Sequence, residues 1–152
     1  MILGYNGQKV FCRSTEEKIL LAMENDHKSS KKISVRDTVI VKGDLSKEYI
    51  LWNTPLVRVH WQNDVYIFIA SNMEERGRYW QPNGFSIWQP RDYIISNTTK
   101  SRLNAFLNYY GFNSLEVHST VKNWSVKYNG EKLKVDSWYK LDLKNKKLLP
   151  AD

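Results

Sequence analysis

The spacing of apolar side chains predicts a first helix over about residues 14–26. Ile19, Leu20 and Met23 would lie on one face of this helix. Ser14 followed by Glu17 forms a capping-box pattern, in which each side chain can satisfy a backbone N–H left free at a helix start. A short strand over 9–13 is expected before this helix, because apolar and β-favouring residues gather there.

A second helix is predicted over about residues 98–110. Leu103, Phe106, Leu107 and Tyr110 recur at positions i, i+3, i+4 and i+7, which places them on one side of a helix. Gly111 follows the last of them and can take the left-handed conformation that ends many helices. We therefore expect a helix with one buried stripe and a defined C-terminal stop.

The remaining apolar pattern favours strands. Between residues 33 and 70, and again after 115, apolar residues alternate or run continuously and β-branched residues become frequent. Asn129-Gly130 predicts a two-residue hairpin turn. The expected fold class is α+β, a single domain over residues 1–152 with mainly antiparallel sheet and two main helices. The predicted strands cover residues 34–42, 48–53, 56–61, 65–69, 115–119, 124–128 and 132–135.

Polar residues alternate with apolar ones in the strand predicted at 56–61. Val57, Val59 and Trp61 alternate with Arg58 and His60. One face of this strand should therefore be buried and the other wet. We expect Arg58 and His60 together on the wet face, or His60 against a covering segment.

The chain is basic, with a net charge of +7 and a pI near 9.4. Nucleic acid, anionic lipid and acidic proteins are the partners that such a field attracts, although many basic domains carry excess lysine only for solubility. Cys12 is the only cysteine, so no internal disulfide can form. No region has the pattern of a signal peptide or of a membrane-spanning helix. A reducing, cytoplasmic setting without a membrane partner is expected.

Residues that metal, cofactor or catalytic sites need are not grouped in this sequence. His27, His60 and His118 lie far apart and have no paired cysteine, and neither GxxxxGK[ST] nor GxGxxG occurs. A two-histidine phosphodiesterase would pair the motif His118-Ser119-Thr120 with His60, but the segment after His60 lacks the matching hydroxyl. We therefore expect no metal, no cofactor and no catalytic activity.

Basic and aromatic residues are interleaved over residues 73–91, which lack periodicity and are predicted to form a long surface excursion. Arginine contacts phosphate through two hydrogen bonds and exposed rings stack on bases, so this composition suits single strands or RNA. A protein partner is an equal fit, and several of the rings could instead fill the core. The basic segment 27–32 is expected to be a solvated loop. The candidate contact residues in the excursion are Arg76, Arg78, Tyr79, Trp80, Trp88 and Arg91.

The start of the second helix has an unusual charge pattern. Helix N-termini carry partial positive charge and favour Asp or Glu, yet residues 98–102 read TTKSR. These hydroxyls and cations are expected to bind a phosphate or a partner's carboxylate; alternatively, Asp92 or a C-terminal carboxylate from elsewhere in the fold neutralises them without a function. Replacing Lys100 and Arg102 with Ala, as surface substitutions, is expected to leave the melting temperature nearly unchanged and to weaken partner binding markedly. The candidate site residues here are Thr98, Thr99, Lys100 and Arg102.

Residues 98–104 read TTKSRLN, follow an alternating β segment and precede a strand that contains Trp124. This pattern resembles small proteins of bacteriophages and mobile elements, over the region from Thr38 to Trp138. The helix over 14–26 and the excursion depart from that family's pattern. The resemblance implies an accessory binding protein in the host cytoplasm. We expect nucleic acid as its partner; the alternative is an inhibitor that docks on a host protein, as anti-defence factors such as anti-CRISPR proteins do.

Overall fold

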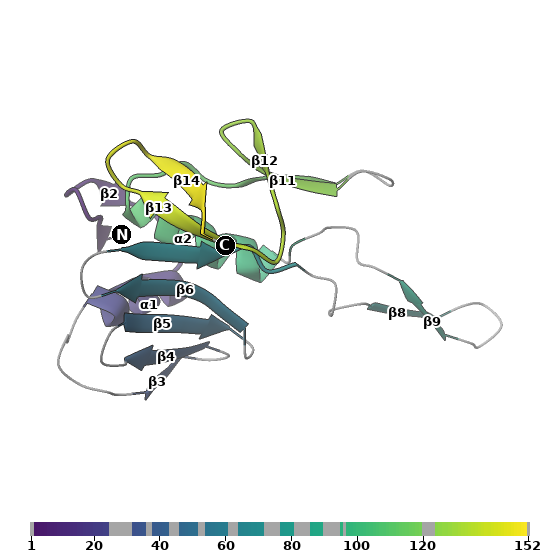
Figure 1. Ribbon diagram of the computed structural model, residues 1–152. Coiled ribbons are helices and arrows are strands. Elements are labelled where there is room, and N and C mark those ends of the chain that lie inside the picture. The colour runs from purple at the N-terminus through teal and green to yellow at the C-terminus, as the bar shows by residue number, and fades with distance from the viewer. Residues whose placement is uncertain are drawn as a thin grey trace.

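The chain folds as an α+β protein, as its sequence predicts (Figure 1). The computed structural model describes residues 2–24, 32–35, 38–42, 46–51, 54–60, 64–71, 77–80, 86–89, 95, 97–119 and 124–151. These residues form two helices, α1 (Ser14–Glu24) and α2 (Asn97–Tyr109), and strands that pair antiparallel throughout. Both helices lie on one side of the largest sheet, behind it in the view of Figure 1.

The largest sheet has seven strands in the order β14-β13-β7-β6-β5-β4-β3. The last two strands in the sequence, β13 and β14, extend the sheet beyond β7, so the C-terminal part of the chain forms one edge of the sheet. The prediction of a single strand over 34–42 is wrong, because β3 and β4 are separate strands that pair with each other, with Val35 opposite Thr38. The strands are β3 (Lys32–Val35), β4 (Thr38–Lys42), β5 (Ser46–Leu51), β6 (Thr54–His60), β7 (Val65–Phe68), β13 (Trp138–Asp142) and β14 (Lys147–Pro150).

Three smaller sheets complete the described structure. The hairpin predicted at Asn129-Gly130 is confirmed: both residues have positive φ, 48° and 84°, and Tyr128 pairs with Glu131 across the turn. Positive φ at both turn positions matches the right-handed twist of the strands, which is why Asn-Gly is favoured there. The strands are β1 (Ile2–Leu3) with β2 (Lys9–Val10), β8 (Gly77–Trp80) with β9 (Ser86–Gln89), and β10 (Glu116–Ser119) with β11 (Trp124–Tyr128) and β12 (Glu131–Leu133).

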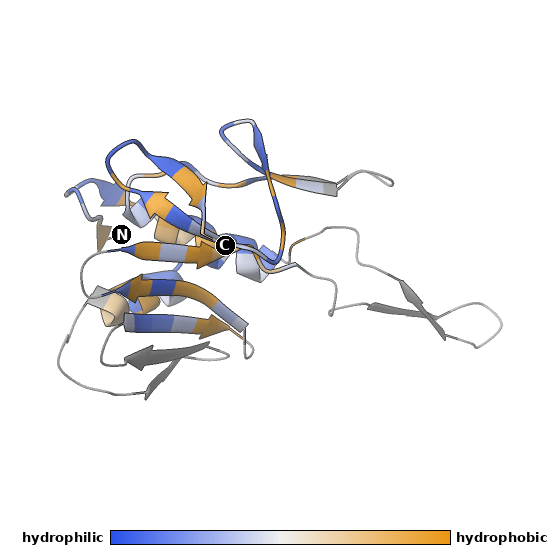
Figure 2. Ribbon diagram, in the orientation of Figure 1, coloured by the Kyte–Doolittle hydropathy of each residue, from blue (hydrophilic) through white to orange (hydrophobic). Residues whose placement is uncertain are grey.

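Alternation along the strands of the large sheet separates a helix-facing side from an outer face. In β5 the residues at alternate positions, Lys47, Tyr49 and Leu51, are buried. The Tyr49 ring packs against Phe106 of α2, with 5.4 Å between ring centroids, so this side faces the helices. Hydrophobic residues gather on β6 and β7 at the centre of the sheet (Figure 2). The core therefore lies between the large sheet and the two helices.

The predicted stop of the second helix is confirmed at Gly111. Its φ is +83°, and the N–H groups of Gly111 and Phe112 donate to the carbonyls of Asn108 and Leu107, at 3.1 and 2.8 Å. This pair of bonds is a Schellman motif, which satisfies carbonyls that a helix end leaves free. Lys146, from the turn between β13 and β14, donates to the Tyr110 carbonyl at 2.8 Å.

The C-terminal end of α1 is also capped by a lysine from the sheet. Lys47, which is 2% exposed, donates through Nζ to the carbonyl of Met23. Neither helix has a basic residue in its own last turn. Cations favour the negative end of a helix, and here β5 and the β13–β14 turn supply them.

Replacing Gly111 with Ala should lower the free energy of unfolding by about 1–2 kcal/mol, because a Cβ disfavours the left-handed backbone. Steric contact contributes little, since the nearest atoms to an added Cβ are the ends of the Lys146 and Asn6 side chains, at 3.3 and 3.5 Å. Gly111→Asn is the control, since Asn tolerates this conformation and should cost less. Urea denaturation measures both. Equal losses in the two variants would contradict a conformational origin.

Candidate functional site

The outer face of the large sheet carries a row of polar and aromatic residues across five strands. Glu48, Arg58, Tyr66, Lys140 and Leu149 are successive cross-strand partners from β5 to β14. Neighbouring strands lie roughly 4.8 Å apart, so this row spans about 19 Å. The helices lie against the opposite face (Figure 1).

Arg58 lies over an aromatic ring on this face. Its Nε donates to Glu48 Oε1 at 2.6 Å, and its guanidinium carbon lies 4.8 Å from the centroid of the Trp138 ring. Trp138 in turn packs against Phe68, with 5.2 Å between ring centroids. In the described part of the chain the terminal nitrogens of Arg58 make no hydrogen bond. A stacked, oriented guanidinium with free terminal nitrogens can meet a phosphate or a carboxylate.

Two further contacts extend this surface. The His60 ring lies edge-on to Tyr66 at 5.2 Å between centroids, and Lys140 lies 3.5 Å from Asp64. Both groups of the second pair are exposed, at 42% and 45%, and exposed ion pairs contribute little free energy. Lys140 can therefore exchange Asp64 for another anion at small cost. We call the residues Arg58, His60, Tyr66, Phe68, Trp138 and Lys140 the aromatic face.

Sequence reasoning found only part of the aromatic face. Arg58 and His60 were expected together on the wet side of their strand, and the structure confirms this. Tyr66 and Trp138 were missed, although each alternates with buried residues along its strand. The alternation could have placed each ring on the outer face of its own strand. It could not show that β7 pairs with β13, which brings the two rings to one surface.

Four of the residues predicted in the 73–91 excursion lie on a pair of strands. The described part of this segment is therefore not irregular: β8 and β9 pair so that Arg78 lies opposite Trp88 and Trp80 opposite Ser86. Tyr79 lies opposite Ile87 in the same ladder. Arg76 and Arg91 lie outside the described residues, and the exposure of Trp80 and Trp88 stays a prediction. Residues 27–31 of the predicted basic loop also lie outside them, and its last residue, Lys32, begins β3 instead of lying in a loop.

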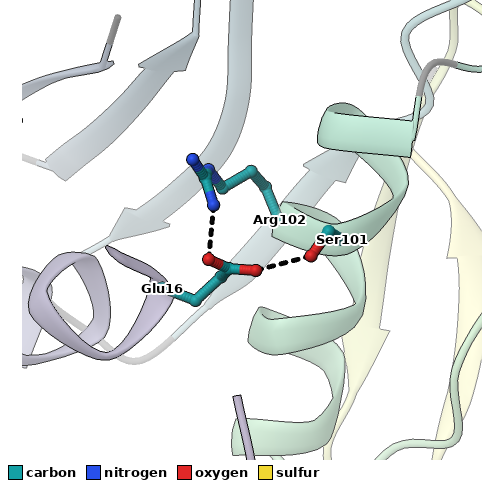
Figure 3. Close-up of polar contacts among 3 residues, drawn as sticks. All are labelled: Glu16, Ser101 and Arg102. Carbon is teal, nitrogen blue, oxygen red and sulfur yellow. Dashed lines mark hydrogen bonds and ion pairs between the residues drawn. The ribbon is translucent and has the colours of Figure 1, made fainter. Parts of the chain in front are cut away.

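The structure corrects part of the binding site predicted at the start of α2 (Figure 3). Arg102 is buried, and its Nη1 lies 2.5 Å from Oε2 of Glu16 on α1. Ser101 donates to the other carboxylate oxygen, also at 2.5 Å. The carboxylate that neutralises Arg102 is therefore Glu16 of α1, which is neither of the acids that the sequence suggested. The expectation that Arg102 is a surface cation, on which an unchanged melting temperature depends, is wrong.

The other predicted residues at this helix start have different environments. Thr99 is buried, Thr98 is half-buried in the first turn, and Lys100 is half-buried beside a cleft. The cleft has a volume of about 400 Å³ and lies between α2 and the segment that leads into α1. Only Lys100 of the four predicted residues lines it, together with Ser101, Asn104 and Asn108 from the same helix.

Cys12 lies in the wall of this cleft and is partly buried. Burial raises the pKa of the Cys12 thiol, and the carboxylates of Glu17 and Glu16 raise this pKa further. Because the thiolate is the nucleophile, the thiol is a poor one at neutral pH. The cleft is thus not built around an activated cysteine.

The described residues offer little support for other chemistry. His60 and His118 lie on strands of different sheets, β6 and β10. Within the described ranges there is no group of three His, Cys, Asp or Glu residues that could hold a metal ion. Neither α1 nor α2, the helices of the described chain, is long and apolar enough to span a membrane.

Comparison with known proteins found no match among family models, curated proteins or solved structures. The resemblance to phage proteins therefore stays a prediction.

Replacing Arg102 with Ala should lower the free energy of unfolding by about 3–5 kcal/mol, because it leaves the buried Glu16 carboxylate without its cation. Lys100→Ala, two residues away on the same helix, is the matched control and should change stability by no more than about 0.5 kcal/mol. Chemical denaturation measures both. Similar small losses in the two variants would show that the ion pair does not hold the helices together.

The pH at which Cys12 becomes reactive should lie above the ordinary thiol pKa of 9.0. A raised pKa means less thiolate at a given pH, so the rate of alkylation by iodoacetamide should keep rising beyond that pH. Glu17→Gln removes the stronger of the two carboxylate effects and should lower the midpoint of the pH profile. The midpoint is independent of how accessible the thiol is. A wild-type midpoint at or below 9.0 would contradict the assigned environment.

Proposed function

We propose that this chain is a non-catalytic protein that binds single-stranded nucleic acid on the aromatic face of its large sheet. The observation that carries the proposal is the Arg58 guanidinium, oriented by Glu48 and stacked over Trp138 beside Phe68. Rings on a sheet surface stack on bases of any sequence, and neighbouring cations contact the phosphates between them. Such binding is consistent with the accessory, phage-type role that the sequence resemblance implies.

The roles of the residues follow from their positions. Trp138 and Phe68 form one stacking platform, and Tyr66 with His60 forms a second one in the neighbouring row. Arg58 and Lys140 lie on either side of Tyr66 in its own row, and each is paired with an acid. A phosphate would compete with Glu48 and Asp64 for these cations. Binding should therefore be moderate in strength and sensitive to salt.

The overall charge favours the same partner. The net charge of +7 raises the local concentration of any polyanion near the surface. Each phosphate neutralised on a single strand adds about −0.7 to the slope of log affinity against log salt. An acidic host protein is the competing partner, and its binding should depend on salt more weakly.

Trp138→Leu should weaken the binding of a labelled single-stranded oligonucleotide by about five- to 150-fold, since stacking contributes about 1–3 kcal/mol per base. Leucine keeps an apolar contact with Phe68, so the fold should be retained. Tyr5→Leu is the matched control, because Tyr5 is an exposed ring, at 46%, that packs against Tyr110 and is not part of the aromatic face. Fluorescence anisotropy at several salt concentrations measures the affinities.

Lys140→Ala gives an independent readout in the same titrations. It should reduce the salt slope by about 0.7 by removing one phosphate contact, whereas Lys132→Ala, an exposed lysine on β12 of another sheet, should not. Absent or salt-insensitive oligonucleotide binding by the wild-type chain would refute the proposal and favour a protein partner.

A further inference from the structure

The cleft between α2 and the segment before α1 is a second surface with a defined chemistry. Its volume of about 400 Å³ lies within the range of small-ligand sites, roughly 300–1,000 Å³. Residues from two separate parts of the sequence line it: Phe11, Cys12, Arg13 and Glu16 on one side, and α2 from Asn97 to Asn108 on the other. It lies among the helices, apart from the aromatic face.

Internal hydrogen bonds leave this wall rich in donors. Asn104 Oδ1 accepts the N–H of Leu115 at 2.8 Å, and Asn108 Oδ1 accepts the Ser114 hydroxyl at 3.3 Å. A backbone N–H can only donate, so the orientation of the Asn104 amide is fixed and its NH₂ group is the part left for a ligand. The Ser114 hydroxyl can donate or accept, so the Asn108 amide can present either its oxygen or its NH₂ group to a ligand.

The acid in this wall is already paired. Both oxygens of Glu16 are occupied, one by Ser101 and the other by Arg102. Arg13 is exposed and Lys100 half-buried, and neither makes an ion pair within the described part of the chain. Two free cations and amide NH₂ groups around a paired carboxylate favour a ligand that accepts hydrogen bonds and carries negative charge.

An exposed ring also borders the cleft. Phe11 is 77% exposed and lines the cleft next to Cys12. A large exposed aromatic ring beside cationic groups offers one surface for a flat, apolar group and another for an anion. A small molecule that carries both a planar ring and a phosphate would contact both surfaces.

We propose that this cleft binds a nucleotide-sized phosphate monoester, with its phosphate between Arg13 and Lys100 and its planar ring against Phe11. Asn104 and Asn108 would donate from their amide groups to the sugar or the phosphate. The Glu16–Arg102–Ser101 cluster positions α1 against α2 and so fixes the width of the cleft. This site is distinct from the proposed nucleic-acid surface and does not depend on it.

Cys12 provides a direct reporter, because it is the only cysteine of the chain and lies in the cleft wall. The full chain is alkylated with iodoacetamide in the presence of adenosine, guanosine, cytidine or uridine 5′-monophosphate, and calorimetry gives the affinities. At least one nucleotide should slow alkylation at roughly millimolar concentration. Ribose 5-phosphate and the matching nucleoside, each carrying half of the ligand, should bind more weakly.

Lys100→Gln should weaken the binding of that nucleotide by about tenfold or more, the usual effect of losing a charge-assisted hydrogen bond. Lys18→Gln on the exposed side of α1 is the matched control and should bind as the wild type does. Phe11→Ser should remove the advantage of the nucleotide over ribose 5-phosphate. Both lysines are surface groups, and unchanged melting temperatures will show that the variants are folded.

Three results would overturn the proposal. They are a lack of protection by all four nucleotides, equal binding by the Lys100→Gln and wild-type proteins, and equal protection by inorganic phosphate and nucleotide, which would exclude a ring contact. Failure here is distinguishable from failure of the nucleic-acid proposal. Trp138→Leu should leave nucleotide binding unchanged, and Lys100→Gln should leave the stacking contribution of Trp138 to oligonucleotide binding unchanged.

Discussion

The buried ion pair between Glu16 and Arg102 is the contact on which the arrangement of the two helices depends. It joins residues 86 positions apart in the sequence, and Ser101 completes it by donating to the second carboxylate oxygen. Arg102 Nε is the buried polar side-chain atom that stays without a partner in the described structure. Burying two charges is costly, and their attraction offsets that cost only while both partners stay in place. The pair therefore specifies one position of α1 against α2 more than it adds net stability.

Charges missing from each helix are supplied by other elements of the fold. α2 has no acid in its first turn and no base in its last, yet Glu16 from α1 lies beside its start and Lys146 from the β13–β14 turn caps its end. α1 likewise receives Lys47 from β5 at its C-terminal end. The charged groups that stabilise the ends of each helix are thus in place only in the folded protein. Isolated helices of this length are marginal in water, so the helices and the sheet should form together.

Packing both helices on one side of the sheet leaves the other side for binding. Buried positions of β5, β7 and β13 face the helices, and the opposite face carries Arg58 of β6, Tyr66 of β7, Trp138 of β13 and their neighbours. The same alternation that forms the core therefore builds the aromatic face. The cleft beside Lys100 arises separately, where the segment before α1 passes the polar side of α2. The two surfaces can be altered independently because they lie on different elements.

Local patterns in the sequence determined the fold class, both helices, the stop at Gly111 and the Asn129-Gly130 hairpin, because periodicity and turn chemistry act over a few neighbouring residues. They also placed Arg58 and His60 on one face. Only the tertiary structure decided that β13 pairs with β7, which brings Trp138 to Phe68 and Arg58. The tertiary structure alone also identified Glu16 as the acid that pairs with Arg102 in the interior. Pairing of distant segments depends on the free energy of the whole fold, and no pattern within one segment records it.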